Sequence, residues 1–350
     1  MTMTIRNSDK IRFGLVGCGR VSRNHFRAFQ AFPEDCVLTA ACDIHEGRLQ
    51  AAVEQTGATG YLDYQAMLDR EDLDAISICT PSGMHPEHGI AAAIRKINVI
   101  TEKPMAIRIA DGDRLIAECD RRKVHLFVVK QNRLNRPMQL LKKALEQGRF
   151  GRLYGIYINV FWQRPQSYYD QASWRGTWQY DGGAFMNQAS HYVDAAQWLF
   201  GEVESVCAIT ATQARKIEAE DSGSAILMFR NGAIGSLNVS MLTFPKDREG
   251  SLTVLGENGT VKIGGVALNR VESWEFADQA EGDHEVRAAD YEPPNVYGFG
   301  HTAYYRNVIR TLKGQAEANT DGRAGRKSLE LILAIYESGK TGRRITLPVA

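Results

Sequence analysis

The sequence predicts an α/β protein with a doubly wound parallel sheet in its N-terminal part, followed by an α/β domain with a predominantly antiparallel open sheet. Short apolar runs alternate with helical stretches up to residue 130, which is typical of parallel strands joined by crossover helices. Beyond residue 130, strand-like runs are joined by turn dipeptides that favour hairpins. A chain of 350 residues exceeds the usual size of one hydrophobic core. We therefore expect two domains, residues 1–130 and 131–350.

The expected elements of the first domain follow in strict alternation. Their composition indicates buried strands and amphipathic helices, so helices should cover both faces of the sheet. The expected strands are residues 11–17, 37–43, 74–80, 97–103 and 125–130. The expected helices are residues 20–32, 45–57, 85–96 and 110–123.

The second domain is expected to open with a helix over residues 137–148 and to close with two more. The pairs Asn231-Gly232 and Asn258-Gly259 predict hairpin turns between neighbouring strands. The strand-like runs are residues 153–162, 203–212, 224–230, 233–242 and 251–265. The closing helices are expected over residues 298–314 and 325–340, and the second of these is a candidate to pack on the first domain.

Composition excludes several classes of function. The chain has 42 basic and 41 acidic residues and a net charge of +1, so no overall field favours nucleic acid or an anionic membrane. No apolar run approaches the roughly 20 residues of a membrane helix, and the first residues lack the apolar core of a secretory signal. The six cysteines form no C-x-x-C pair. We expect a cytoplasmic protein with no disulfide and no bound metal.

A glycine turn after the first strand predicts a dinucleotide site of the Rossmann type. Gly17 and Gly19 let the chain turn tightly and let a pyrophosphate approach the start of a helix, although Ser22 stands where the fingerprint has Gly or Ala. Asp43 ends the second strand, at the spacing of an acid that binds the adenosine ribose. A carboxylate there repels a 2′-phosphate, so NAD is preferred over NADP. The alternatives are a simple strand-to-helix turn and a helix cap at Asp43.

Two further strand ends carry polar residues to the same sheet edge. Thr80 and Pro81 follow one strand, and His85 either belongs with them or begins the next helix. Another strand runs into Glu102, Lys103 and a proline that can adopt a cis bond. A fixed lysine beside a nicotinamide can stabilise the negative charge on a reacting oxygen. The alternative is a solvated ion pair at a strand end.

The stretch "GGAFMNQASHYVD", residues 182–194, predicts a helix with a polar face. Asn187, His191 and Asp194 follow each other at helical spacing, opposite an apolar side. A solvent-exposed face is the simpler explanation. However, the two glycines remove bulk where a ligand could approach, and a histidine can accept a hydroxyl proton. We interpret this face as catalytic, with Asp194 either orienting the imidazole or supporting the helix.

These motifs together resemble the Gfo/Idh/MocA oxidoreductases, over nearly the whole chain. The resemblance implies a Rossmann domain, an open-sheet domain that mediates homo-oligomer contacts as a dimer or tetramer, and NAD as cofactor. It implies Lys103 and His191 as catalytic residues, with Asn187 where family members commonly have Asp. The cofactor residues that it implies are Gly17, Gly19, Arg20, Val21, Asp43, Thr80, Pro81, His85, Glu102 and Lys103.

Two polar segments predict how a sugar substrate is held. Residues 163–183 are rich in Arg, Tyr and Trp, which bind anions and stack on rings, and residues 128–137 add more donors. A plain surface loop remains the alternative for any one of them. The expected substrate residues are Lys130, Asn132, Arg133, Arg164, Tyr168, Tyr169, Arg175, Asn187, His191 and His301.

The same segments are similar to the subgroup of this family that oxidises UDP-N-acetylglucosaminuronate (UDP-GlcNAcA) at carbon 3. That resemblance implies a UDP-linked uronic acid as substrate and a place in lipopolysaccharide (O-antigen) biosynthesis, where the ketone is then aminated. Two alternatives stay open: a dehydrogenase of the same family that acts on a free polyol or another sugar, and a non-catalytic NAD-binding sensor.

Overall fold

In the computed structural model, which describes residues 9–293 and 296–348, the chain forms two compact units. The first unit comprises the chain up to Val129 together with His301–Arg326. The second unit comprises Lys130–Gly300 and the chain from Lys327 onward. The predicted domains, residues 1–130 and 131–350, therefore differ from these units, because residues 301–326 belong to the first unit. That segment holds nearly all of helix α9 (Gly300–Leu312) and the first turn of α10 (Gly322–Thr341).

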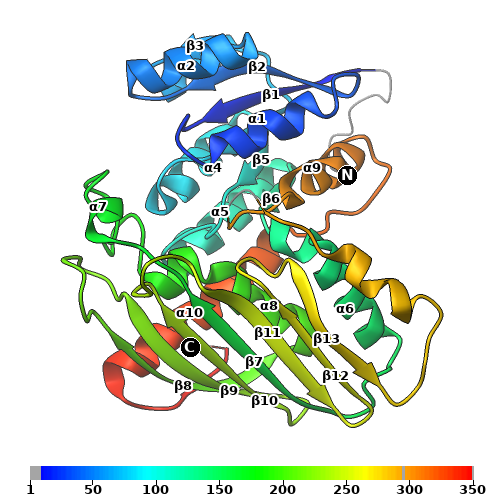
Figure 1. Ribbon diagram of the computed structural model, residues 1–350. Helices are drawn as coiled ribbons and strands as arrows, with labels where there is room; N and C mark the ends of the chain where they lie inside the picture. The colour runs from blue at the N-terminus through cyan, green and yellow to red at the C-terminus, as the bar shows by residue number, and fades with distance from the viewer. Residues whose placement is uncertain (1–8, 294–295, 349–350) are drawn as a thin grey trace. The chain divides into compact units, whose positions relative to one another are not determined.

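The first unit contains a six-stranded parallel sheet in the order β3-β2-β1-β4-β5-β6 (Figure 1). The chain order reverses between β1 and β4, and ligands of such sheets bind at this reversal, beyond the carboxyl ends of the strands. This arrangement confirms the predicted fold class. The strands are β1 (Ile11–Val16), β2 (Cys36–Cys42), β3 (Thr59–Tyr61), β4 (Ala75–Ile78), β5 (Asn98–Thr101) and β6 (Leu126–Val128).

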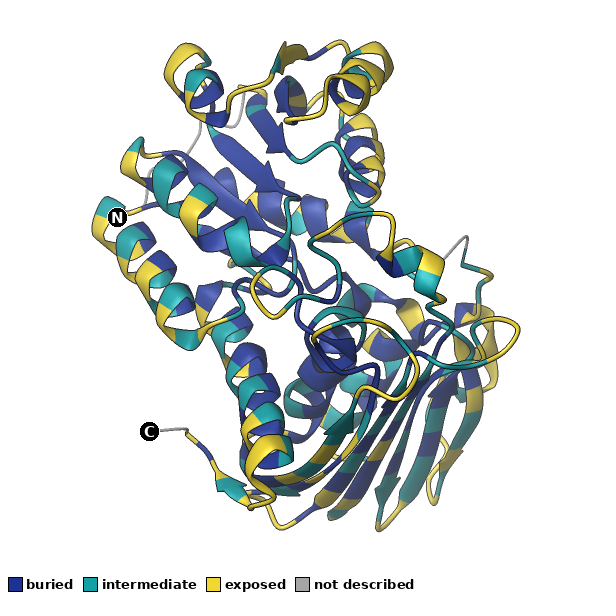
Figure 2. Ribbon diagram, turned by 90° about the vertical axis from the view of Figure 1, so that its left-hand side faces the viewer, coloured by how far each residue is buried: buried dark blue, intermediate teal, exposed yellow. Residues whose placement is uncertain are grey.

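Helices flank this sheet, and Figure 2 shows its strands almost wholly buried. Every residue of β4 and β5 is buried, as expected for strands covered on both faces. Neither β3 nor α3 was predicted from the sequence: β3 is a three-residue edge strand, none of it buried, and α3 has seven residues. The helices are α1 (Ser22–Gln30), α2 (Glu46–Thr56), α3 (Tyr64–Arg70), α4 (His85–Ile94) and α5 (Ile109–Arg122), with the short helix η1 (Ser82–Met84) before α4.

The second unit contains an eight-stranded sheet in the order β13-β12-β11-β7-β10-β9-β8-β14. All neighbours are antiparallel except β10 and β7, so the predicted predominantly antiparallel sheet is confirmed. The strands are β7 (Leu153–Phe161), β8 (Val203–Ala211), β9 (Ser222–Phe229), β10 (Ile234–Ser240), β11 (Glu249–Gly256), β12 (Gly259–Gly264), β13 (Arg270–Phe276) and β14 (Ile345–Thr346).

Helices cover one face of this sheet and leave the other open. Helices α6, α8 and α10 lie on the covered face (Figure 1), and α8 contacts β7 and β10. The helices are α6 (Arg136–Glu146), α7 (Gln166–Tyr169) and α8 (Ser190–Phe200), with shorter helical turns η2 (Gln131–Leu134), η3 (Ala184–Gln188) and η4 (Asp283–Ala289).

On the open face, exposed apolar side chains alternate with small polar ones across neighbouring strands. Tyr157 pairs with Ser236, and Ser236 pairs with Ile226 on its other side. Ile226 is 65% exposed and Ile209 is 77% exposed. Exposed apolar side chains that gather on one sheet face are typical of an association surface.

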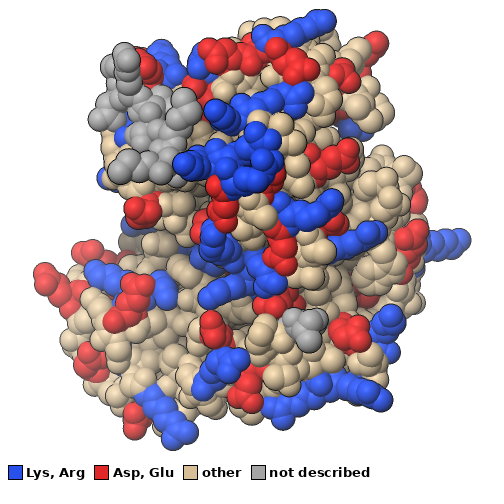
Figure 3. Space-filling model, turned by 180° about the vertical axis from the view of Figure 1, so that it is seen from behind, with Lys and Arg blue, Asp and Glu red and all other residues tan. Residues whose placement is uncertain are grey.

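Basic and acidic side chains are interspersed over the surface shown in Figure 3, in keeping with the balanced charge of the sequence. Among the described residues, no helix is both long and apolar enough to cross a bilayer.

Candidate active site

The glycine turn of the first unit needs glycine at residue 17. Gly17 has a φ of +93°, and a Cβ there would lie 2.7 Å from the backbone carbonyl of Cys79. The turn is further fixed by Ser22, whose hydroxyl donates to the carbonyl of Gly19 at 2.7 Å. Ser22 is fully buried, so a small side chain with one hydrogen-bond donor suits the third position of the fingerprint. Among the described residues, no side chain caps the start of α1, so this end of the helix can receive an anion.

Asp43 lies at the carboxyl end of β2 and binds the glycine turn directly. One carboxylate oxygen accepts from the Cys18 N–H at 2.8 Å, and the other accepts from the His45 N–H at 2.9 Å. Each carboxylate oxygen accepts two hydrogen bonds, so both keep capacity for a ribose hydroxyl. The alternative of a helix cap at Asp43 is wrong, because α2 begins after His45 and no described side chain caps it. The free acceptor capacity of Asp43 is compatible with the cofactor role.

His85 connects two loops at the same sheet edge. Its ring nitrogens lie 2.8 Å from the carbonyl of Thr80 and 2.8 Å from the carbonyl of Pro104. Burial lowers the pKa of His85, although hydrogen bonds to these carbonyls oppose that shift. The Lys103–Pro104 bond is cis, as the sequence analysis considered. Arg20 is exposed, and Gly19, Val21, Thr80, Pro81 and Lys103 are half-buried.

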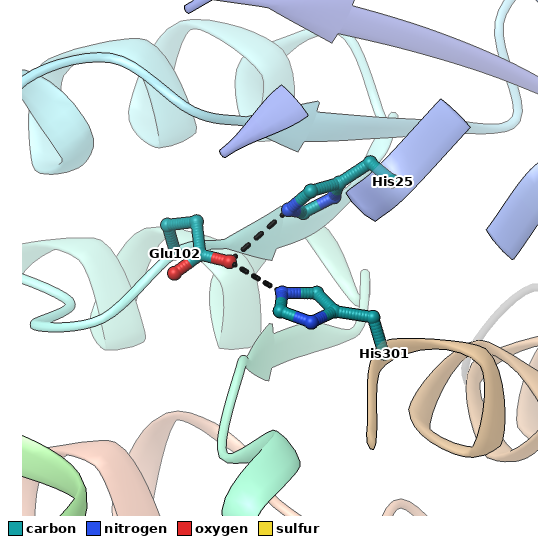
Figure 4. A group of neighbouring side chains, drawn as sticks. All are labelled: His25, Glu102 and His301. Carbon is teal, nitrogen blue, oxygen red and sulfur yellow. Dashed lines mark hydrogen bonds and ion pairs between the residues drawn. The ribbon is translucent and has the colours of Figure 1, made fainter. Parts of the chain in front are cut away.

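Glu102 lies at the centre of a buried cluster, here called the Glu102 cluster, with His25 and His301 (Figure 4). One oxygen of Glu102 lies 3.1 Å from a ring nitrogen of His25 and 3.1 Å from one of His301. The other oxygen accepts from the Lys103 N–H at 3.2 Å. Beyond His25, the hydroxyl of Tyr305 lies 2.7 Å from its second ring nitrogen. The cluster thus joins α1, the end of β5 and α9.

The charge state of the Glu102 cluster follows from these contacts. Burial would raise the pKa of Glu102, but hydrogen bonds from both imidazoles hold it well below the usual range. Burial lowers the pKa of His25, which favours a neutral ring. Two His and one Glu could ligate zinc, and their ligand atoms lie within 4.8 Å of one another. Here they are hydrogen-bonded to one another. His301 was predicted from sequence to bind substrate, and His25 was not predicted, because its only signal is a polar residue on a helix that packs on a sheet.

In the second unit, Asn187 and His191 lie on different elements. The single helix expected from Phe185 onward is wrong: η3 is a π-helical turn that ends at Gln188, and α8 begins at Ser190. His191 is 8% exposed and Asp194 is 2% exposed, so α8 does not present a solvated face. The two glycines also serve the protein itself, because a side chain at Gly183 would overlap the carboxyl group of Glu220.

Asp194 binds cations that were expected to hold the substrate. Arg133 donates to both carboxylate oxygens, at 2.7 and 2.8 Å, and the Lys130 ammonium lies 3.5 Å away. Lys130 also donates to the hydroxyl of Ser328 at 2.7 Å. Burial would raise the pKa of Asp194, and these cations lower it below its usual value. Asp194 therefore supports the packing around α8, and its anchoring of Arg133 was not foreseen. Nearby, Asn132 is buried.

The two arginines of the segment rich in Arg, Tyr and Trp, residues 163–183, have different partners. Arg164 donates to the side-chain oxygen of Gln188 at 2.9 Å and pairs with Asp247 at 3.1 Å. The guanidinium of Arg175 lies 4.2 Å from the ring centre of Tyr168. Within residues 9–293 and 296–348, no carboxylate pairs with Arg175, and its buried Nε has no hydrogen-bond partner. Tyr169 is buried, and burial raises the pKa of its hydroxyl.

Both parts of the chain match models of one protein family. Residues 11–130 match the model of the Gfo/Idh/MocA NAD-binding Rossmann fold, and residues 142–347 match its C-terminal alpha/beta domain. The chain belongs to the Gfo/Idh/MocA oxidoreductase family. It is an oxidoreductase, and its cofactor is NAD.

Two solved structures of the family are especially similar to this chain. The WlbA dehydrogenase from Bordetella pertussis, in complex with NADH and UDP-GlcNAcA, is 52% identical, with a TM-score of 0.93 over 99% of this chain and 100% of that one. The WlbA dehydrogenase from Chromobacterium violaceum, in complex with the same two molecules, is 52% identical, with a TM-score of 0.95 over 100% and 99% of the chains. Myo-inositol 2-dehydrogenase of Thermotoga maritima is 27% identical, over 96% of this chain and 98% of its own.

Asn187, which the resemblance places where family members commonly have Asp, lies beside a carboxylate. The Asn187 amide donates to a carboxylate oxygen of Asp181, and the other oxygen of Asp181 accepts from the Gly176 N–H at 2.7 Å. An aspartate at position 187 would face Asp181 with a second negative charge. The amide therefore suits a site in which the neighbouring residue 181 already carries the carboxylate.

Proposed function

We propose that this protein oxidises the 3-hydroxyl group of UDP-GlcNAcA to a ketone with NAD. The observation that carries this proposal is the full-length likeness, at 52% identity, to two dehydrogenases crystallised with NADH and UDP-GlcNAcA. The 3-keto sugar would then be available for amination in bacterial O-antigen synthesis.

The proposed chemistry assigns one role to each of two side chains. NAD, when bound, accepts the hydride from carbon 3. His191 accepts the proton of the 3-hydroxyl group, and the Lys103 ammonium hydrogen-bonds the same oxygen as negative charge develops on it. Asn187 hydrogen-bonds the sugar. Lys103 belongs to the first unit and His191 to the second.

Arg175 is the better candidate of the two loop arginines for an anion of the substrate. Its guanidinium is supported by the Tyr168 ring, whereas Arg164 already pairs with Asp247. Lys130 and Arg133 both pair with Asp194, and its carboxylate offsets part of their positive charge. We assign Arg175 to the uronate carboxylate or the diphosphate, since a guanidinium forks onto either group.

The test is to incubate the purified protein with UDP-GlcNAcA, UDP-GlcNAc, myo-inositol and glucose. We expect a 3-keto product from UDP-GlcNAcA alone, detected by mass spectrometry as a loss of two hydrogens. Product is measured as well as NADH absorbance, because a cofactor that stays bound and is reoxidised in place would give no net absorbance.

Lys103→Ala and His191→Asn test the assigned roles. We expect both variants to bind NAD as the wild type does and to lose turnover by about two to four orders of magnitude. Arg215→Ala is a control, because Arg215 donates to the backbone carbonyl of Arg164 without a proposed chemical role. Near-normal rates in both variants would refute the assignment.

A polyol dehydrogenase is the second candidate, favoured by the full-length match to myo-inositol 2-dehydrogenase. Oxidation of myo-inositol, with UDP-GlcNAcA left unchanged, would establish that alternative.

A further inference from the structure

The π-helical turn η3 begins without a capping side chain of its own. Gly183 precedes it, and such a turn leaves its first N–H groups without partners inside the helix. These groups are buried, so they need acceptors from elsewhere in the protein. The turn carries Asn187 and leads directly into α8 and His191.

Two residues from distant parts of the chain supply all the acceptors. The hydroxyl of Tyr336, on α10, accepts from the N–H groups of Gly183 at 3.2 Å and Met186 at 3.0 Å. Glu220, just before β9, accepts from the Ala184 N–H through its backbone carbonyl at 3.0 Å. Its carboxyl oxygen accepts from the Phe185 N–H at 2.8 Å. Four consecutive N–H groups are thus bound by Glu220 and Tyr336.

The hydrogen-bond capacity of the Tyr336 hydroxyl is fully used at this turn, whereas Glu220 binds through Oε1 and its buried Oε2 has no partner among the described residues. The Tyr336 hydroxyl uses both lone pairs on the two N–H groups and donates its one proton to Glu220 at 3.0 Å. The Glu220 carboxyl group fills the space that the missing side chain of Gly183 leaves. Any shift of Glu220 or Tyr336 would therefore leave buried N–H groups of η3 unsatisfied.

We propose that Glu220 and Tyr336 are positioning residues that cap η3 from outside and thereby set the places of Asn187 and His191. This inference rests on the proposed catalytic role of those two residues. It explains why a buried acid and a buried phenol lie beneath a turn that contains no titratable side chain of its own.

The protonation state of Glu220 makes the proposal testable. Burial raises the pKa of Glu220 to about 8, and the nearby Asp181 carboxylate adds to the shift while Tyr336 opposes it. The carboxyl group is therefore mostly neutral at pH 7. A glutamine is nearly identical in shape and keeps the same acceptor oxygen, so Glu220→Gln should preserve the cap, whereas Glu220→Ala should remove it.

The experiment compares Tyr336→Phe, Glu220→Ala and Glu220→Gln with the wild type. We expect Tyr336→Phe and Glu220→Ala to lower the single-turnover rate at least tenfold, with the Kd for NAD unchanged. Glu220→Gln should stay within about threefold of the wild type. Tyr192→Phe is the matched control, because the buried Tyr192 hydroxyl has no hydrogen-bond partner among the described residues.

Two measurements separate this proposal from the choice of substrate. Hydrogen exchange of the amides of residues 183–186 should quicken at least tenfold in Tyr336→Phe but not in Tyr192→Phe. Unchanged exchange would overturn the proposal even if the enzyme is active. Faster exchange with an unaltered turnover rate would overturn the positioning role. If the wild type oxidises a different sugar, that sugar serves for the rate comparison; if it oxidises none, a positioning role in catalysis is overturned with the proposed function.

The pH dependence of stability adds a third measurement. A folded pKa of about 8, above the ordinary value of 4.5, gives a stabilisation that is complete below pH 4.5 and is lost as the pH rises through 8. Glutamine does not titrate, so the Tm of Glu220→Gln relative to the wild type should rise between pH 6 and pH 9. A constant difference would contradict a neutral Glu220.

Discussion

Asp43 shows how one side chain can shape a turn and remain able to bind the cofactor. Its carboxylate binds two backbone N–H groups, which fixes it at the end of β2 facing the glycine turn. Sequence reasoning could place Asp43 there because strand ends and glycine spacing are local properties. It could not foresee that the same carboxylate holds the turn together.

Asp43→Ala tests whether this carboxylate binds the adenosine ribose of NAD. We expect a higher Kd for NAD, because a hydrogen-bond acceptor for the ribose is lost. We also expect a smaller preference for NAD over NADP, because the repulsion of a 2′-phosphate is removed. Asp63→Ala is a control, since Asp63 caps α3 with a comparable hydrogen bond to a backbone N–H. Fluorescence titration with NAD and with NADP gives the ratio of the two Kd values. An unchanged ratio would count against the ribose role.

Single residues of the second unit were harder to assign from sequence, because their partners are far away along the chain. Arg133 was expected to bind substrate, yet it binds Asp194, 61 residues further on. Asn187 was recognised as a departure from the family, but its partner Asp181 was not. Which cation meets which carboxylate depends on how the elements pack, and periodicity carries no information about that.

At the scale of elements, regular periodicity predicted most of the secondary structure. Parallel strands buried on both faces read as continuous apolar runs, and Asn-Gly pairs at 231–232 and 258–259 marked hairpins that the structure contains. The π-helical turn was missed because an ordinary helix fits the same apolar pattern. Its register depends on acceptors from Glu220 and Tyr336, which lie outside the segment.

The Glu102 cluster joins three elements of the first unit. His301→Ala tests how much this cluster contributes to the stability of the fold. Loss of one hydrogen bond to a buried carboxylate should lower the free energy of unfolding by about 1.5–3 kcal/mol. Chemical denaturation measures this loss. His284→Ala is the control, because the His284 side chain is 80% exposed. If His301→Ala instead raised the KM for the sugar with no loss of stability, the substrate role expected from sequence would be supported.

At the scale of the whole molecule, the open sheet face is the surface that we expect a second copy of the chain to cover. The exposed Ile226 and Ile209 lie on the neighbouring strands β9 and β8, and Tyr157 lies two strands away from Ile226. Covering such apolar area removes it from water and favours association. The resemblance to the family led to the same expectation, as a dimer or tetramer.

Ile226→Glu tests this expectation by placing a charge among the exposed apolar side chains of this face. Light scattering after gel filtration should give a multiple of 39.0 kDa for the wild type and a smaller mass for the variant. Ile44→Glu is the matched control, because Ile44 is 83% exposed in the first unit. A wild type that elutes as a monomer, or a variant with unaltered mass, would contradict the expected interface.

The return of residues 301–326 to the first unit has a consequence for how the protein is made. The ring of Tyr305 packs 4.9 Å from that of Phe29, and the hydroxyl of Tyr305 lies 2.5 Å from that of Ser77. During synthesis on the ribosome, the nascent chain up to Val129 must wait for α9 to emerge before the core of the first unit can close. The unit that is translated first is therefore completed nearly last.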